Sequence, residues 1–144
     1  MKRFFTLLMV SAFCLSAISG CKSVVTFEQL PTEAQTFLTE NFSASPVSYA
    51  VKECNEYDVV LTDGTEIEFN GKGEWESVDM NHGAVPATVL ATLPPSIVSH
   101  LTTSFANVPV EKVKKGFWPA YKVELINDLE LEFNSKGVCT KVDD

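Results

Sequence analysis

The sequence repeats itself at a shift of 64 residues, and this internal repeat restricts the fold more than any other feature. Residues 57–79 align with residues 121–143, and 11 of the 23 aligned positions are identical. A unit of about 60 residues is only marginally stable alone. We therefore expect two units, residues 21–80 and 81–144, that share buried surface within one domain. The identical pairs are Tyr57/Tyr121, Val59/Val123, Leu61/Leu125, Glu66/Glu130, Glu68/Glu132, Phe69/Phe133, Asn70/Asn134, Lys72/Lys136, Gly73/Gly137, Val78/Val142 and Asp79/Asp143.

Each unit begins with the pattern of an amphipathic helix. Pro31 suits the first turn of a helix in the first unit, and Pro94-Pro95 takes the same place in the second. A further short helix is expected at residues 86–92. Apolar residues follow each proline at helical spacing, namely Ala34, Phe37, Leu38 and Phe42 in the first unit and Ile97, Leu101 and Phe105 in the second.

The rest of each unit alternates apolar and polar residues, which predicts half-buried antiparallel strands. Turn signals at Asp63-Gly64 and at residues 70–73 separate the strands of the first unit. The expected product is an α+β fold, in which helices pack on one face of an antiparallel sheet. The expected strands are 47–53, 57–61, 66–70 and 74–79 in the first unit, and 121–126, 129–134 and 138–143 in the second.

The hairpin at residues 63–65 has two possible registers. A two-residue turn would pair Val60 with Ile67 and would put Ile67 and Val59 on opposite faces of the sheet. A three-residue connection or a bulge would return both to one apolar face. We favour the second register, because the first would bury glutamates beside the valines.

The first 20 residues have the pattern of a signal peptide. Lys2 and Arg3 precede an apolar stretch, residues 4–17, which is too short for a comfortable membrane span. The sequence Ile18-Ser19-Gly20-Cys21 resembles the bacterial lipobox, which implies lipidation of Cys21 and cleavage before it. The alternative is an ordinary secretory peptide that is cleaved nearby. Because almost no linker follows Cys21, we expect the domain to lie close to the membrane, attached through its lipid anchor only.

The chain is acidic, with a formal net charge of −8 that becomes −10 once Lys2 and Arg3 are removed. Phosphates attract lysine and arginine, so this charge argues against nucleic acid as a partner. It favours solubility and is compatible with a basic partner.

The repeated motifs resemble those of the PepSY-like, beta-lactamase-inhibitor-like family of small envelope proteins. Each copy contains Leu-Pro, a helix ending at Phe, Tyr-x-Val-x-Leu, Glu-x-Glu-Phe-Asn, x-Lys-Gly and Val-Asp. The resemblance implies two helix-plus-four-strand units and a Gram-negative envelope location. The motifs are structural, so no inhibitory residue can be carried over. The copies also differ, since Trp75 is replaced by Cys139 and Gly64 by Asp128.

No catalytic or metal-binding arrangement is found in the sequence. His82 lies in the link between the units, and His100 lies on the second helix, where we expect it to have no counterpart in the first unit. Neither has a partner at zinc-ligand spacing. Cys54 and Cys139 could form a disulfide in an oxidising envelope, but separate, mostly buried thiols are the expectation. We therefore expect no enzyme activity, no cofactor and no metal.

An acidic stripe is also expected along the strands. Alternate carboxylates on a strand do not converge as Ca²⁺ requires, so we interpret the stripe as a solvated sheet face that discourages aggregation. Its members are Glu66, Glu68, Glu74, Glu76, Asp79, Glu130 and Glu132.

Three aromatic residues are the candidates for partner binding. Phe117 and Trp118 lie in or beside a strand connection, where large apolar groups are less expected, and Trp75 is present in only one unit. Trp and Tyr are enriched at interface hot spots. Core packing is the alternative for all three. The sequence thus predicts a non-enzymatic, lipid-anchored periplasmic binding module for a protein or peptide, and the alternative function is an inhibitor or regulator of an envelope enzyme.

Overall fold

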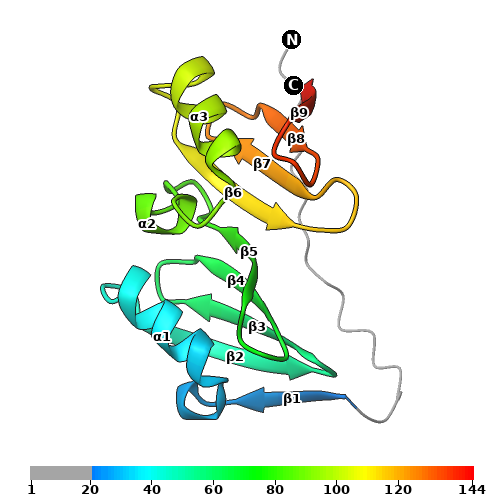
Figure 1. Cartoon of the computed structure of the whole chain (residues 1–144). Helices are drawn as coiled ribbons and strands as arrows, with labels where there is room; N and C mark the ends of the chain where they lie inside the picture. The colour runs from blue at the N-terminus through cyan, green and yellow to red at the C-terminus, as the bar shows by residue number, and fades with distance from the viewer. Residues whose placement is uncertain (1–20) are drawn as a thin grey trace.

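In residues 21–144, nine strands form one antiparallel sheet in which each strand pairs only with its neighbours in sequence, from β1 to β9 (Figure 1). The structure is a computed structural model that describes residues 21–144, so the expected signal peptide lies outside the described residues. The chain begins with β1 (Lys22–Val25), η1 (Phe27–Gln29), α1 (Thr32–Asn41), β2 (Val47–Glu53), β3 (Glu56–Leu61), β4 (Glu66–Asn70) and β5 (Trp75–Asp79). It continues with α2 (Ala87–Leu90), α3 (Pro95–Ser104), β6 (Val110–Lys115), β7 (Tyr121–Leu125), β8 (Glu130–Phe133) and β9 (Cys139–Asp143).

The α+β class is confirmed, but two strands were missing from the sequence prediction. β1 is a short edge strand of four largely exposed residues, so it has no alternation to detect. β6 buries only Val110 and Val113, and its pairing with β7 shifts register between Val110 and Lys112. The other four residues of β6 are charged, so its sequence shows little alternation of apolar and polar residues.

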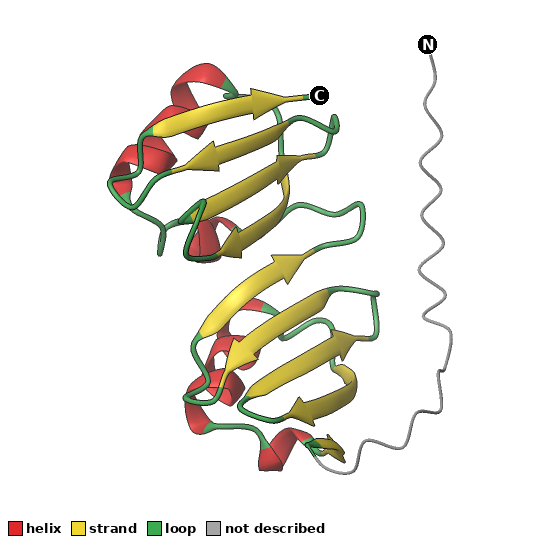
Figure 2. Cartoon of the chain, turned by 90° about the vertical axis from the view of Figure 1, so that its right-hand side faces the viewer, coloured by secondary structure: helices red, strands yellow, loops and turns green. Residues whose placement is uncertain are grey.

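One hydrophobic core runs through both halves of the sheet. In Figure 2 the helices lie behind the strands. Leu38 of α1 and Ile97 of α3 are buried in the same cluster as Phe69 of β4 and Phe133 of β8, which are both completely buried. Burial of such a side chain contributes about 1.5–3 kcal/mol. This shared burial fixes the helices against the sheet.

The β3–β4 hairpin has the register that restores a single apolar face. Val59 pairs with Ile67, and both are buried. The connection consists of residues 62–64, one position earlier than expected, because Leu61 N–H bonds to the Thr65 carbonyl. Gly64 has a φ of +90°, a conformation that glycine adopts without strain. The preference for a three-residue connection is therefore confirmed.

The two halves meet at β5 and β6. Ser77, Val78 and Asp79 pair with Lys114, Val113 and Lys112, respectively. Val78 and Val113 are completely buried, and the Lys112 ammonium lies 2.8 Å from the Asp79 carboxylate. Burial alone would lower the pKa of Lys112, but its hydrogen bond to Asp79 raises the pKa overall. The junction is therefore a continuous part of the sheet and of the core.

Among residues 21–144 the cysteines are free, but Cys54 is exposed and Cys139 only half-buried, so the expectation of mostly buried thiols was wrong. Cys54 lies in the β2–β3 turn, where its N–H bonds to the carbonyl of Cys21 at 2.8 Å. Cys139 begins β9, and strands β4 to β8 separate it from that turn. A bridge between Cys54 and Cys139 is therefore excluded by the order of the strands. Among residues 21–144, no helix is long and apolar enough to cross a membrane.

Candidate functional site

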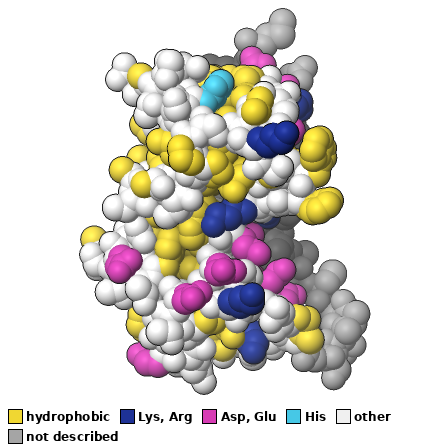
Figure 3. All heavy atoms as spheres, viewed as in Figure 1, with side chains coloured by type: hydrophobic (Ala, Val, Ile, Leu, Met, Phe, Trp, Pro, Cys, Tyr) yellow, Lys and Arg dark blue, Asp and Glu magenta, His cyan; other side chains and the backbone are white. Residues whose placement is uncertain are grey.

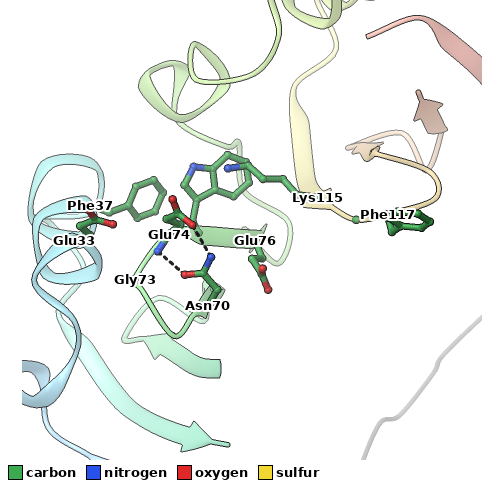
Figure 4. Close-up of a pocket in the computed structure, with 10 residues that line it drawn as sticks. Glu33, Phe37, Asn70, Gly73, Glu74, Glu76, Lys115 and Phe117 are labelled. Carbon is green, nitrogen blue, oxygen red and sulfur yellow. Dashed lines mark hydrogen bonds between the residues drawn. The ribbon is translucent and has the colours of Figure 1, made fainter. Parts of the chain in front are cut away.

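An open groove lies at the junction of the two halves, and Trp75 forms its floor. Trp75 begins β5 and is only 6% exposed. Its ring stacks on Phe37 of α1, with centroids 6.1 Å apart and an interplanar angle of 25°. The Lys115 ammonium, at the end of β6, lies 3.6 Å from the centroid of the same ring (Figure 4). The floor thus joins one residue from each half through a cation–π contact.

Acidic side chains line the groove above this floor. The groove has a volume of about 850 Å³ and is lined by Glu33, Phe37, Asn70, Gly73, Glu74, Trp75, Glu76, Lys115, Gly116 and Phe117. Three of these residues are glutamates, and Lys115 is the one lysine among them. In Figure 3, hydrophobic side chains gather between the two halves, with acidic side chains beside them. The groove can therefore attract a cationic group and offer it an aromatic surface.

The three glutamates, Glu33, Glu74 and Glu76, form the acidic wall of the groove, and the β4–β5 turn positions Glu74. The Asn70 side-chain oxygen accepts hydrogen bonds from the N–H groups of Lys72 and Glu74, and the Asn70 amide donates to the Glu74 carboxylate at 2.7 Å. Gly73 has a φ of +89°, and a Cβ there would lie 2.8 Å from the backbone nitrogen of Ala34. The start of α1 can therefore approach the turn only because residue 73 is glycine.

Lys115 occupies the groove without a close carboxylate partner. Burial lowers the pKa of Lys115, and the charges of Glu74 and Glu76 act in the opposite direction. Among residues 21–144, no carboxylate lies within 4.0 Å of its ammonium. The ammonium is therefore held mainly by the Trp75 ring.

The β6–β7 loop, residues 116–120, presents two exposed aromatic side chains. Phe117 is 99% exposed and Trp118 is 81% exposed. Gly116 N–H bonds to the Ala120 carbonyl at 3.0 Å and closes the loop, and the Trp118–Pro119 peptide bond is cis. Figure 4 shows the Phe117 ring extending away from Phe37 and Lys115. The three aromatic candidates from the sequence thus separate into a buried floor, Trp75, and an exposed aromatic tip, Phe117 and Trp118.

His100 has a counterpart in the first half, contrary to the sequence prediction. Its ring lies 5.6 Å from Phe133 and 5.9 Å from Phe105. Phe37 lies 5.7 Å from Phe69 and 5.9 Å from Phe42, at the same interplanar angles within one degree. The shift of 63 residues that relates the helices also relates Phe37 to His100. Applied to position 37, that shift would have found the pair.

His82 lies in the link between β5 and α2 and contacts Glu111. Its backbone N–H bonds to the Glu111 carboxylate at 2.8 Å, while its side chain is 89% exposed. Within residues 21–144, no three His, Cys, Asp or Glu side chains gather in a way that could hold a metal ion.

The expected acidic stripe is interleaved with lysines. Lys114 lies 3.3 Å from Glu68, and Lys122 lies 2.9 Å from Glu130. These lysines come from β6 and β7, whose charges the sequence analysis did not consider. These lysines neutralise part of the negative charge of the stripe, because opposite charges on neighbouring strands attract each other.

A family model described as "Putative beta-lactamase-inhibitor-like, PepSY-like" matches residues 55–141. The chain belongs to this family. The resemblance inferred from the repeated motifs is therefore confirmed. No curated protein matches the chain.

Three solved structures resemble this PepSY-like chain over 85% of its length. One, from Bacteroides thetaiotaomicron, is described as "a putative calcium-regulated periplasmic protein"; it is 32% identical, is covered to 97% and gives a TM-score of 0.77. A second, from Bacteroides vulgatus, is described as a periplasmic protein of unknown function; it is 30% identical, is covered to 99% and gives a TM-score of 0.76. A third, also from Bacteroides vulgatus, is described as "a putative periplasmic protein"; it is 28% identical, is covered to 97% and gives a TM-score of 0.76.

Proposed function

We propose that the protein is a non-enzymatic periplasmic binding module that is anchored by lipid at Cys21 and holds a protein or peptide partner. The similar structures are all described as periplasmic, which supports this location. The observation that carries the binding proposal is the groove between the halves, with its Trp75 floor and its acidic wall. Its volume falls within the usual range of binding pockets, roughly 300–1,000 Å³.

The charges of the groove favour a partner segment that contains arginine or lysine. Glu33, Glu74 and Glu76 line it, opposed by Lys115 alone. A cationic side chain beside an apolar one would satisfy both the carboxylates and the aromatic floor.

Lys115 can give way to such a side chain. It makes no close ion pair among the described residues, and its place over Trp75 costs it hydration, which is why its pKa is lowered. A guanidinium from the partner stacks on aromatic faces better than an ammonium does. We propose that the Lys115 ammonium covers the Trp75 ring until a cationic side chain of the partner takes its place.

The test compares captured envelope proteins on matched columns. The mature chain from Lys22 onward serves as bait, beside a Glu33→Gln/Glu76→Gln variant and a Glu40→Gln/Glu56→Gln control that loses the same charge outside the groove. We expect one envelope protein to bind the wild type and the control but not the groove variant. Titration of that protein with each bait then measures affinity, which should fall at least about tenfold for the groove variant.

Equal retention on all three columns contradicts the groove as the site, and no specific retention contradicts a protein partner altogether. If the captured protein is an enzyme whose activity falls on binding, the module is a regulator.

We also propose that the two halves are copies of one ancestral unit. The bulge in the β4–β5 pair precedes Phe69–Trp75, and the bulge in the β8–β9 pair precedes Phe133–Cys139, 64 residues later. The same irregularity at equivalent positions supports duplication, because a bulge has no general reason to recur at a fixed interval. The groove would then have arisen after the duplication, because the stack of Phe37 on Trp75 is present in one copy only.

A further inference from the structure

The residue expected to carry the lipid anchor lies directly at the start of the sheet. β1 begins at Lys22, and the Cys21 carbonyl already accepts a hydrogen bond from Cys54. No flexible linker therefore separates an acyl group on Cys21 from the folded domain. A rigid attachment of this kind forces one end of the sheet toward the bilayer.

The aromatic tip belongs to the same end of the strands as Cys21. Pairing is antiparallel throughout, and Cys21 faces the β2–β3 turn. That end of the strands also carries the β4–β5 turn and the β6–β7 loop, because each odd-numbered strand up to β7 starts there. In Figure 1 the start of the β1 arrow and the β6–β7 loop both lie on the right-hand side of the strands. Five strand spacings separate them, or about 24 Å.

The aromatic tip has the composition of a bilayer-interface contact. Phe117 and Trp118 are almost fully exposed, and residues 116–120 contain no charged side chain. Tryptophan is enriched where the hydrocarbon meets the headgroups. In water, by contrast, two neighbouring exposed aromatic rings are costly.

Charges of both signs lie near the two contact points, and the whole chain is acidic. Lysines pair with some carboxylates of this part of the sheet, as in Lys22–Glu53 and Lys114–Glu68. Among residues 21–144, Glu56, Glu74 and Glu76 at this end make no ion pair within 4.0 Å. Lys115, at the base of the tip, adds a further positive charge within reach of anionic headgroups.

We propose that Phe117 and Trp118 form a second membrane contact, inserted into the interface of the same bilayer that holds Cys21. This inference rests on the lipid anchor of the proposed function. Two contacts about 24 Å apart restrict how the domain can rotate about its anchor. The bound orientation then holds the β5–β6 groove close to the membrane surface.

The test uses acylated full-length protein, purified from membranes and reconstituted in phosphatidylethanolamine/phosphatidylglycerol vesicles with or without brominated acyl chains. The chain has two tryptophans, Trp75 and Trp118. In a Trp75→Phe background we expect shallow bromines to reduce Trp118 emission by roughly half, since interfacial indoles lie at that depth. In the Trp118→Phe protein, the buried Trp75 should be unaffected. If Trp75→Phe does not fold, the difference between wild type and Trp118→Phe gives the same measurement.

Two further variants separate the aromatic tip from the anchor. A Phe117→Ser/Trp118→Ser protein should stay on vesicles but lose protection of Lys115 from aqueous amine-reactive reagents. A flexible Gly/Ser linker of about 20 residues after Cys21 should reduce Trp118 quenching, because the tip's effective concentration at the bilayer falls.

Unquenched Trp118 in protein whose intact mass confirms acylation overturns the proposal. An unacylated Cys21 overturns both the anchor and the membrane contact. Loss of the captured partner on Phe117→Ser/Trp118→Ser, without quenching in wild type, assigns the tip to a protein instead. The Glu33→Gln/Glu76→Gln variant should leave Trp118 quenching unchanged. Failure of the groove as a binding site is therefore distinguishable from failure of the membrane contact.

Discussion

At the scale of residues, a single position explains why the two halves differ in surface. Phe37 and His100 make matching contacts with Phe69 and Phe133. Only Phe37 also stacks on an indole, because Trp75 is replaced by Cys139 in the second half. The aromatic floor therefore forms in the first half, beside the β5–β6 junction.

Placing a phenyl ring at position 100 and an imidazole ring at position 37, in two separate variants, should change stability in opposite directions. We expect His100→Phe to raise the free energy of unfolding by about 0.5–1 kcal/mol, because a phenyl ring gains contact with Phe105 and Phe133 without burying a polar group. Phe37→His should lower it by at least about 1 kcal/mol, since the imidazole would be enclosed by Phe69 and Trp75. Urea denaturation of both variants checks this. A destabilising His100→Phe would show that the histidine makes a polar contact that the structure does not explain.

Asp58 should weaken the fold at neutral pH. Burial raises its pKa, and the nearby charges of Glu68 and Glu53 raise it further. A raised carboxyl pKa in the folded state means that stability falls as the pH rises through the window between the ordinary and the raised value. We expect Asp58→Asn to stabilise the protein at pH 7 by at most about 1 kcal/mol, given the exposure of the group.

The gain from Asp58→Asn should vanish below about pH 3, where Asp58 is protonated in both states. Denaturation curves across this range measure it, with Glu40→Gln as a control on α1. A gain that does not depend on pH would point to a cause other than charge.

At the scale of elements, α1 depends on the glycine in the turn below it. A Cβ at Gly73 would meet the backbone of Ala34 and the side chain of Pro31, both at 2.8 Å. Gly64 has a similar φ, but its nearest neighbour is the flexible Asn81 side chain at 3.2 Å. The two glycines therefore share the same backbone strain and differ in what surrounds them.

Alanine at these two positions should separate strain from crowding. Gly64→Ala should cost about 1–2 kcal/mol, the cost of a left-handed backbone for alanine. Gly73→Ala should cost at least about 1 kcal/mol more, because α1 must also move. Thermal and urea unfolding measure both. Equal losses would contradict the close approach of α1 to the turn.

Regular elements could be predicted from the sequence, and irregular ones could not. The helices after Pro31 and Pro94 and the strand at residues 66–70 follow from periodicity alone. β6 and β1 do not, because four of the six residues of β6 are charged and β1 is short and exposed. Phe117 and Trp118 could be selected as unusual, but their exposure depends on loop geometry. Lys115 could not be found, since its role requires that β6 pair with β5.

At the scale of the whole molecule, the β5–β6 junction makes one cooperative unit of two marginal halves. Val78 and Val113 are completely buried there, and the core cluster continues on both sides. Because each half is too small to be stable alone, we expect a single unfolding transition. Calorimetry tests this, with equal calorimetric and van't Hoff enthalpies as the expected result. Two resolved transitions would show that the halves are independent.

The ion pair across this junction should contribute modestly. Asp79→Asn and Lys112→Met, measured singly and together, should give a coupling energy of about 0.5–1 kcal/mol, because both side chains are partly exposed. The pair Lys22–Glu53, which is more exposed, provides the comparison and should couple more weakly. A coupling near zero for Asp79–Lys112 would leave apolar packing as the main link between the halves.

The strictly sequential strand order also affects how the chain can assemble. Every strand finds its first partner in the segment that precedes it, so no strand must wait for a distant part of the chain. A polypeptide that emerges amino end first can therefore add one strand after another to a growing template. The connections β1–β2 and β5–β6 contain helices, and the other connections are short turns or loops. The unpaired edge moves along with synthesis to β9, which carries Lys141 and Asp143. Charges at that final edge discourage a tenth strand from another molecule.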